Sequence, residues 1–192
     1  NANFEIKDGS LSINAKSSGF VSIVHDPWRP VPSEGGHLGK NPGLFNRINI
    51  DKRLDVAVFQ THYLKENIHL SGIPTLHTSV TCDQESFDIC VALSLISEGE
   101  EIINQFTTGF LRIKKNIKDT ERDYTIKLHP TNISITKGSK LRLSLSASAW
   151  PAIGVNSGHN KVRGGNTSID HKITTLNFNL KKSIMKINPF FK

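Results

Sequence analysis

The chain has 192 residues, of which 24 are Lys or Arg and 17 are Asp or Glu, so its formal net charge is +7 at pH 7. Hydrophobic residues make up 36% and charged residues 21%, which is typical of a folded protein and excludes a disordered chain. No apolar run approaches the roughly 18 residues that span a bilayer, and two cysteines exclude a disulfide-stabilised scaffold. A single domain over residues 1–192 is predicted.

Apolar and polar residues alternate with a period of two along much of the chain, a pattern that predicts β-strands. In the first half of the chain, Asp8-Gly9 predicts a hairpin between the strands expected at residues 4–6 and 11–13. Gly72 and Pro74 interrupt the strand expected at residues 68–82 and indicate an edge or a bulge there. The proline-rich segment 26–32 ends the third strand, and residues 33–49 have the composition of a long surface loop. The predicted strands lie at residues 4–6, 11–13, 20–24, 56–60 and 68–82.

Residues 87–96 give the clearest strand pattern, with Phe87, Ile89, Val91, Leu93 and Leu95 on one face. Because several intervening residues are also apolar, we expect a central strand. A helix of the same length is the alternative, and the strict alternation with β-branched residues favours the strand.

A hairpin is predicted between residues 76–82 and 87–96, with its turn at Gln84–Glu85. In that hairpin Cys82 and Cys90 would lie too far apart along the strands to form a disulfide. The prediction is therefore two buried free thiols, which fits a reducing compartment.

The second half of the chain contains further alternating segments and one loop, 151–168, that is almost free of apolar residues. About nine short strands in the whole chain, with no helix among them, predict an all-β fold, either a sandwich or a jelly roll. The strands of this half are expected at residues 105–113, 124–128, 141–147, 173–180 and 183–187.

Motifs that carry chemistry are missing from the sequence. The string 154–158 resembles a nucleophile elbow, but its serine stands one place late. Asp170 and His171 are adjacent, so in a strand their side chains would point to opposite faces. Histidines and cysteines show no metal-ligand spacing, and no glycine-rich loop precedes a helix. We therefore predict no catalytic residue, no cofactor and no metal in this chain.

The scattered basic residues form no stripe with interleaved aromatic residues, so a nucleic-acid partner is not predicted. Nothing in the sequence predicts a membrane partner either.

Five residues near the segment 26–32 are candidates for an interface with another domain: Asp26, Trp28, Arg29, Arg53 and Asp55. Trp28 stands on a stiff proline-flanked backbone, and it either closes one end of the core or, with Arg29, anchors a partner, since Trp and Arg are enriched in interface anchors. The alternation of Asp51, Arg53 and Asp55 predicts local ion pairs on one face.

Four segments in a fixed order carry a resemblance to a known family: DPWRPVPSEGGHLG (26–39), residues 45–94, TTGFLRIKK (107–115) and KGSKLRLSLSASAWP (137–151). They resemble the C-terminal, non-catalytic domain of the X-Pro dipeptidyl-peptidases and the cocaine-esterase-like (CocE/NonD) acyl hydrolases. The resemblance is strongest over residues 20–151 and loosest over 151–168.

This resemblance implies a jelly-roll β-sandwich of galactose-binding type that follows an α/β-hydrolase domain. In the family the Ser-Asp-His triad belongs to that catalytic domain, so no triad residue is expected in this chain, which resembles a fragment cut just after it. The parent would be a serine hydrolase, acting on an Xaa-Pro peptide bond or an ester. Its accessory sandwich would pack on the hydrolase domain, help shape the substrate cleft or support a homo-oligomer, in the cytoplasm.

Two other functions remain open at the level of sequence. The first is a stand-alone carbohydrate-binding sandwich, which requires exposed aromatic rings. Exposure of Trp150 and Tyr124 on one rim would favour this function. The second is an oligomerisation module, which would present an exposed apolar patch.

Overall fold

The computed structural model describes residues 3–7, 10–14, 19–36, 41–160, 168–187 and 189–191. Over these residues the chain forms strands joined by turns and loops, with one short 3-10 helix, η1 (Ser168–Asp170), and no α-helix. The strands are β1 (Asn3–Lys7), β2 (Ser10–Asn14), β3 (Phe20–His25), β4 (Phe45–Asn46), β5 (Ala57–Thr61), β6 (Ile68–Gly72), β7 (Thr75–Cys82), β8 (Phe87–Ile96), β9 (Asn104–Ile113), β10 (Arg122–Lys127), β11 (Thr131–Ile135), β12 (Lys140–Ser146), β13 (Thr174–Lys186) and β14 (Pro189–Phe191).

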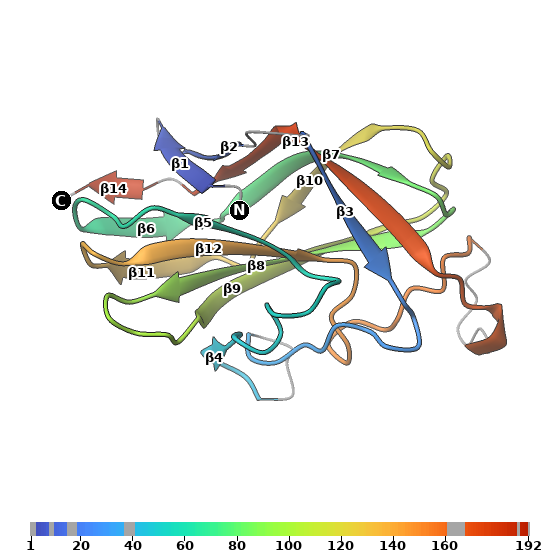
Figure 1. Ribbon diagram of the computed structural model, residues 1–192, viewed down its shortest axis with the longest axis horizontal. Coiled ribbons are helices and arrows are strands. Elements are labelled where there is room, and N and C mark those ends of the chain that lie inside the picture. The colour runs from blue at the N-terminus through green and yellow to red at the C-terminus, as the bar shows by residue number, and fades with distance from the viewer. Residues whose placement is uncertain are drawn as a thin grey trace.

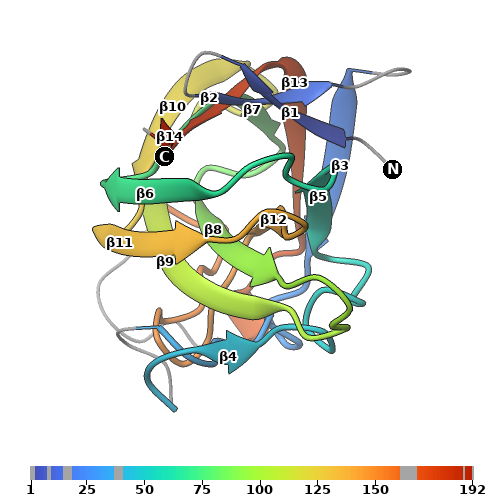
Figure 2. The same ribbon diagram turned by 90° about the vertical axis from the view of Figure 1, so that its left-hand side faces the viewer.

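Most of the strands belong to one sheet that folds over on itself. Its order is β10-β7-β13-β2-β1-β5-β12-β8-β9-β4, and β3 pairs with the first half of β13 while β2 pairs with its end. Neighbours are antiparallel, except for the parallel contact of β1 with β5. Figures 1 and 2 show β7, β10 and β13 on one side of the molecule and β8, β9 and β12 on the other. A small second sheet, β11-β6-β14, lies at one end. The predicted all-β sandwich is confirmed.

The core lies between these two layers and consists of the apolar side chains that stand at every second position of the strands and point inward. Both layers contribute, with Leu76 and Phe178 from one side and Ile89 and Leu143 from the other, each fully shielded from solvent. The prediction for residues 87–96 is confirmed, because β8 lies between β12 and β9 and its apolar face points into the core.

The predicted hairpin between residues 76–82 and 87–96 is wrong. β7 pairs with β10 and β13, whereas β8 pairs with β9 and β12 in the opposite layer. The connecting residues bond to other segments instead of turning back: the Asn116 side-chain amide donates to the carbonyls of Cys82 and Gln84 at 3.3 and 2.9 Å. The chain therefore crosses between layers at the point where a turn was expected. Both cysteines are nevertheless buried and free, as predicted.

Two other strand predictions differ from the structure. Residues 68–82 form two strands in different sheets, because the break at Gly72 and Pro74 is complete. Residues 173–187, expected as two strands, form the single strand β13, in which the register shifts between Asn179 and Ile184. Lys181 and Lys182 lie at this irregularity with exposed side chains.

The Asp8-Gly9 turn lies outside the described residues, but the strands on either side of it pair antiparallel as predicted. Three strands have no counterpart among the predicted ones: β4, β11 and β14.

The two layers approach each other closely where β9 passes the end of β10. A Cβ atom on Gly109 would lie 2.5 Å from the Lys127 carbonyl oxygen and 2.7 Å from the Leu128 Cα, which are backbone atoms that cannot rotate away. Next to it, the His129 amide donates to the Thr108 carbonyl at 2.9 Å and the Thr107 hydroxyl donates to the His129 carbonyl at 2.8 Å. Glycine at position 109 permits this contact between layers.

Candidate inter-domain surface

The segment after β3 forms a tight turn that holds Trp28 away from the core. The Asp26 carboxylate accepts the Trp28 amide at 3.0 Å, and the Asp26 carbonyl accepts the Arg29 amide at 3.0 Å. Asp is favoured at the start of such turns because its side chain bonds to its own backbone two residues on. The Trp28 side chain is 52% exposed, and its ring lies 6.2 Å from that of His171. Of the two alternatives, closure of the core by Trp28 is wrong.

Arg53 joins this turn to the next segment of the chain. Its Nε and Nη2 donate to the two Asp55 carboxylate oxygens at 2.8 and 2.7 Å, and Nη2 also donates to the Arg29 carbonyl at 2.8 Å. The hydrogen bond to Asp55 raises the pKa of Arg53 above its ordinary value. The structure thus brings together all five predicted interface residues.

Asp51 does not belong to this group, although the alternation of residues 51–55 suggested it. Residues 48–55 form turns instead of a strand, so alternate side chains do not share a face. The Asp51 carboxylate is buried and accepts from Arg47 Nε at 3.1 Å and from the Ser144 hydroxyl at 2.9 Å.

An exposed apolar row continues from Trp28 along β3. In the pairing of β3 with β13, Phe20, Ser22 and Val24 lie opposite Asn179, Asn177 and Thr175. Phe20, Val24, Trp28 and Ile173 are 49%, 50%, 52% and 54% exposed. The contact between Trp28 and His171 shows that the two chain segments still run side by side beyond the strands. We call these four side chains the β3 strip. The sequence identified only Trp28, because no local pattern shows whether another layer covers the face that carries the other three.

The loop after β12 returns beside the turn that carries Trp28. The Trp150 amide donates to the Val31 carbonyl at 3.0 Å, and the Trp150 carbonyl accepts the Ser33 amide at 2.6 Å. The Trp150 side chain is exposed. Tyr124, in contrast, packs edge-on against Phe87 at the core, with ring centroids 5.7 Å apart. The pair of exposed rings required for the carbohydrate-binding alternative is therefore not formed by these two residues.

Part of the loop predicted at 151–168 is fixed to β8 by an ion pair whose carboxylate, Asp88, is buried. Arg112 Nε and Nη2 donate to the Asp88 carboxylate at 2.8 and 2.7 Å, and Nη2 also donates to the Gly154 carbonyl. The Asn156 amide donates to Asp88 at 2.9 Å and to the Ser86 hydroxyl at 3.1 Å. Residues 154–156 are thus positioned by contacts that the sequence did not indicate; residues 161–167 lie outside the described part.

The described residues contain no arrangement that resembles a hydrolytic site. Asp170 ends η1, and the ring of His171, just after it, lies tilted at 45° to the ring of Trp28, with no nucleophile beside it among the described residues. Burial raises the pKa of Cys82 to about 12 and also raises the pKa of Cys90, so both thiols stay protonated and unreactive. In the same part of the chain, no group of three or more His, Cys, Asp or Glu residues could hold a metal ion. Over the described residues, the structure has no helix long and apolar enough to cross a membrane.

The model of the X-Pro dipeptidyl-peptidase C-terminal non-catalytic domain matches residues 3–182. The chain belongs to this family. The resemblance noted in the sequence is thereby confirmed. No curated protein matches the chain.

Solved structures of several hydrolases contain a similar fold. An aminopeptidase from a marine sediment Thaumarchaeota archaeon matches with a TM-score of 0.78 and 17% identity, over 97% of this chain and 36% of that protein. An α-amino acid ester hydrolase matches with a TM-score of 0.80 and 16% identity, over 98% of this chain and 35% of that protein. A CocE/NonD family hydrolase from Staphylococcus aureus matches with a TM-score of 0.58 and 14% identity, over 100% of this chain and 37% of that protein. The chain thus spans about a third of the length of these structures, and identities this low support the shared fold only.

Proposed function

We propose that this sandwich is the accessory domain of a serine hydrolase of the X-Pro dipeptidyl-peptidase or acyl-esterase type. In this proposal it packs on the α/β-hydrolase domain of the same polypeptide and helps shape the substrate cleft, while the catalytic triad lies outside these 192 residues. The match to a family described as non-catalytic carries the proposal. A jelly-roll strand order and a cytoplasmic location are part of it; two free buried thiols fit a reducing compartment.

The surface that would face the hydrolase domain is the β3 strip together with the turn next to it. Trp and Arg are the residues most enriched in interface anchors, and Trp28 and Arg29 stand exposed side by side on a turn fixed by Asp26 and Arg53. A rigid anchor loses little conformational freedom on binding. The strip adds apolar area on a sheet edge, where an unpaired strand commonly needs a cover.

Oligomerisation is the second function that this surface supports, because an exposed apolar row suits a second copy as well as a hydrolase domain. The carbohydrate-binding alternative lacks an observation in its favour, since Tyr124 packs on the core.

Activity and polypeptide size test the proposal. The purified 192-residue chain should hydrolyse neither p-nitrophenyl esters nor Xaa-Pro anilides above buffer, and turnover that a serine-directed inhibitor blocks would overturn this. A blot of the source with an antibody against the chain should show a band of roughly 60 kDa or more, as a preceding hydrolase domain requires. A band at the mass of these 192 residues would contradict the accessory role.

The position of the interface has its own test in the full-length protein. Trp28→Asp with Ile173→Asp should lower its melting temperature and leave that of the 192-residue chain unchanged, because the strip is covered only in the former. Ile102→Asp, on the exposed turn between β8 and β9, is the matched control and should have no effect in either. An equal loss in both proteins would show that the strip stabilises the sandwich itself.

A further inference from the structure

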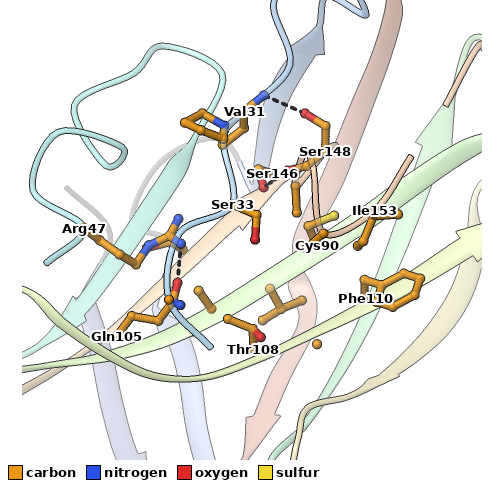
Figure 3. Close-up of a pocket in the computed structure, with 18 of the residues that line it drawn as sticks. Val31, Ser33, Arg47, Cys90, Gln105, Thr108, Phe110, Ser146, Ser148 and Ile153 are labelled. Carbon is orange, nitrogen blue, oxygen red and sulfur yellow. Dashed lines mark hydrogen bonds between the residues drawn. The ribbon is translucent and has the colours of Figure 1, made fainter. Parts of the chain in front are cut away.

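A cavity of about 60 Å³ lies on the face of β8, β9 and β12 that points away from the core. Its floor consists of small side chains in two rows across the strands, Ser146–Cys90 and Ser144–Ala92–Thr108, as the strand register shows. Residues 31–35 and 148–153 cover this floor without filling it. Figure 3 shows Arg47 and Gln105 at one side of the cavity, Ile153 and Phe110 at the other, and Ser33 between them.

The polar wall of the cavity contains a buried guanidinium with an unused edge. Arg47 is 6% exposed, and its Nε and Nη1 donate to Asp51 at 3.1 Å and to Gln105 at 2.6 Å. Within the described part of the chain, no group accepts a hydrogen bond from Arg47 Nη2. A guanidinium has five N–H donors in a planar fork, so this edge is available to an acceptor inside the cavity. The hydroxyls of Ser33 and Thr108 line the same space and form no hydrogen bond to the described residues.

The charge balance around the cavity is positive. The Asp51 carboxylate accepts from two guanidinium groups, from Arg47 Nε at 3.1 Å and from Arg142 Nη1 at 3.4 Å. One carboxylate therefore faces two positive charges, and one of them is in excess. None of the described residues that line the cavity is acidic. Glu34, between the lining residues Ser33 and Gly35, accepts from the Asn41 side chain at 3.1 Å. A buried positive charge without a full partner favours an anion at the site.

We propose that this cavity binds a carboxylate group on a short aliphatic stem. The Arg47 edge would hold the carboxylate together with the Ser33 and Thr108 hydroxyls, since charge-assisted bonds from Arg to a carboxylate are strong and directional. Val31, Ile153 and Phe110 would contact the stem. The volume admits on the order of four to six non-hydrogen atoms, because one water needs roughly 10–15 Å³ of such space. The carboxylate belongs either to a free short-chain acid or to an Asp or Glu side chain of a bound segment. This inference does not rest on the proposed function.

Propionate is the probe that tests the site, with propionamide as its uncharged isostere. In ¹⁵N-labelled 192-residue chain, propionate should cause saturable shifts of the Ser33, Ala92 and Thr108 amide signals, against a sodium chloride reference. Titration extends to about 100 mM, because a ligand this small reaches millimolar affinity. Propionamide should cause none. No saturable shift with propionate, or equal shifts with both ligands, would overturn the proposal, the second result indicating a site for small polar molecules without regard to charge.

Three variants test whether propionate binds in the cavity or elsewhere on the protein. Arg47→Lys keeps a cation beside Asp51 but loses the fork, so propionate affinity should fall at least about tenfold. Ala152→Leu should block the cavity without touching the buried ion pairs and should abolish binding. Arg122→Lys, on the exposed face of β10, is the matched control. Undiminished binding in a folded Ala152→Leu chain would place the propionate elsewhere and refute the site.

A second ligand, N-acetyl-glutamate N-methylamide, tests whether the bound carboxylate belongs to a free acid or to a side chain of a polypeptide. Tighter binding of this ligand than of propionate supports a side chain of a bound polypeptide segment. Equal or weaker binding supports a free short-chain acid.

Discussion

The two outer faces of the sandwich have opposite polarity. The outer face of β8 and β12 is covered by the chain's own loops, and the residues beneath that cover are polar or small, with two buried ion-pair groups around Asp88 and Asp51. The outer face of β3 is open, and it carries large apolar side chains, Phe20, Val24 and Trp28. The covered face thus buries the Asp88 and Asp51 carboxylates, whereas the open face leaves Trp28 in solvent.

The difference follows from how each face is held in place. On the covered face, hydrogen bonds and ion pairs attach irregular loops to the sheet, because a loop without regular structure must satisfy its backbone through side chains. On the open face the described residues supply no such cover, and in the proposed function its apolar area would contact another domain. Substitutions on the covered face should therefore change the stability of the isolated chain, and those on the open face should not.

Removal of the Asp88 carboxylate should have the largest effect. Asp88→Ala leaves Arg112 and the Asn156 amide without their shared acceptor at a site that is 2% exposed. Loss of one partner of a buried pair costs about 3 kcal/mol of unfolding free energy, measurable by urea denaturation. The exposed pair of Glu121 with Lys182 is the control, and Glu121→Ala should show no measurable change. Equal midpoints for the two variants would mean that the loop 154–158 does not depend on Asp88.

The close approach of β9 to the end of β10 gives the next effect in size. Gly109→Ala places a Cβ 2.5 Å from the Lys127 carbonyl oxygen, so the two layers must separate locally. Overpacking of this kind costs about 2 kcal/mol, again by urea denaturation. Gly154→Ala is the matched control, because its Cβ would meet nothing within 4 Å. A neutral Gly109→Ala would show that the layers can part without loss of packing.

The sequence predicted the core face well and the covered face poorly. Alternation reports which side of a strand is apolar, and so residues 87–96 were assigned correctly to a central strand. Alternation carries no information about which strands are neighbours. The expected hairpin from 76–82 to 87–96 is wrong because β7 pairs with β10 and β13, whereas β8 pairs with β9 and β12.

The polar groups of the covered face had no local pattern to reveal them. Asp88, Arg112 and Asn156 are separated by more than twenty residues at each step and meet only when the layers are formed. Arg47 had one weak indication, a single basic residue in the largely uncharged stretch 41–50. Trp28 is recognisable because a large apolar ring between prolines is unusual in a loop, whereas nothing in the sequence distinguishes Ile173 from an ordinary strand residue.

His25 lies on β3, and it has a hydrogen bond to the backbone of Asn156 in the loop of the covered face. Its titration should change the free energy of unfolding less than Asp88→Ala or Gly109→Ala. The His25 side chain is 3% exposed and points inward. Burial lowers its pKa below the ordinary 6.5, against the opposing hydrogen bond to the Asn156 backbone and the carboxylates of Asp88, Asp55 and Asp26. In the range between the folded pKa and 6.5 the unfolded chain binds more protons.

The contribution of neutral His25 to the free energy of unfolding should therefore be complete above pH 6.5 and should be lost as the pH falls below it. Urea midpoints between pH 5 and pH 8 measure this, and His25→Leu should flatten the dependence below pH 6.5. His77→Asn, on the half-buried side of β7, serves as the control that keeps it. An unchanged slope in His25→Leu would assign the acid sensitivity to other groups.

Substitutions on the open face should have the smallest effect on the isolated chain. Trp28→Ser with Ile173→Ser removes two side chains that are more than half exposed, and the change in unfolding free energy should stay within about 0.5 kcal/mol. Less apolar surface should also reduce self-association, measurable by analytical ultracentrifugation at high protein concentration. A loss as large as that for Asp88→Ala would contradict the comparison, because it would mean that the β3 strip stabilises the sandwich from within. A neutral result in the isolated chain would agree with the proposed interface, because it would show that these exposed apolar side chains contribute little to folding.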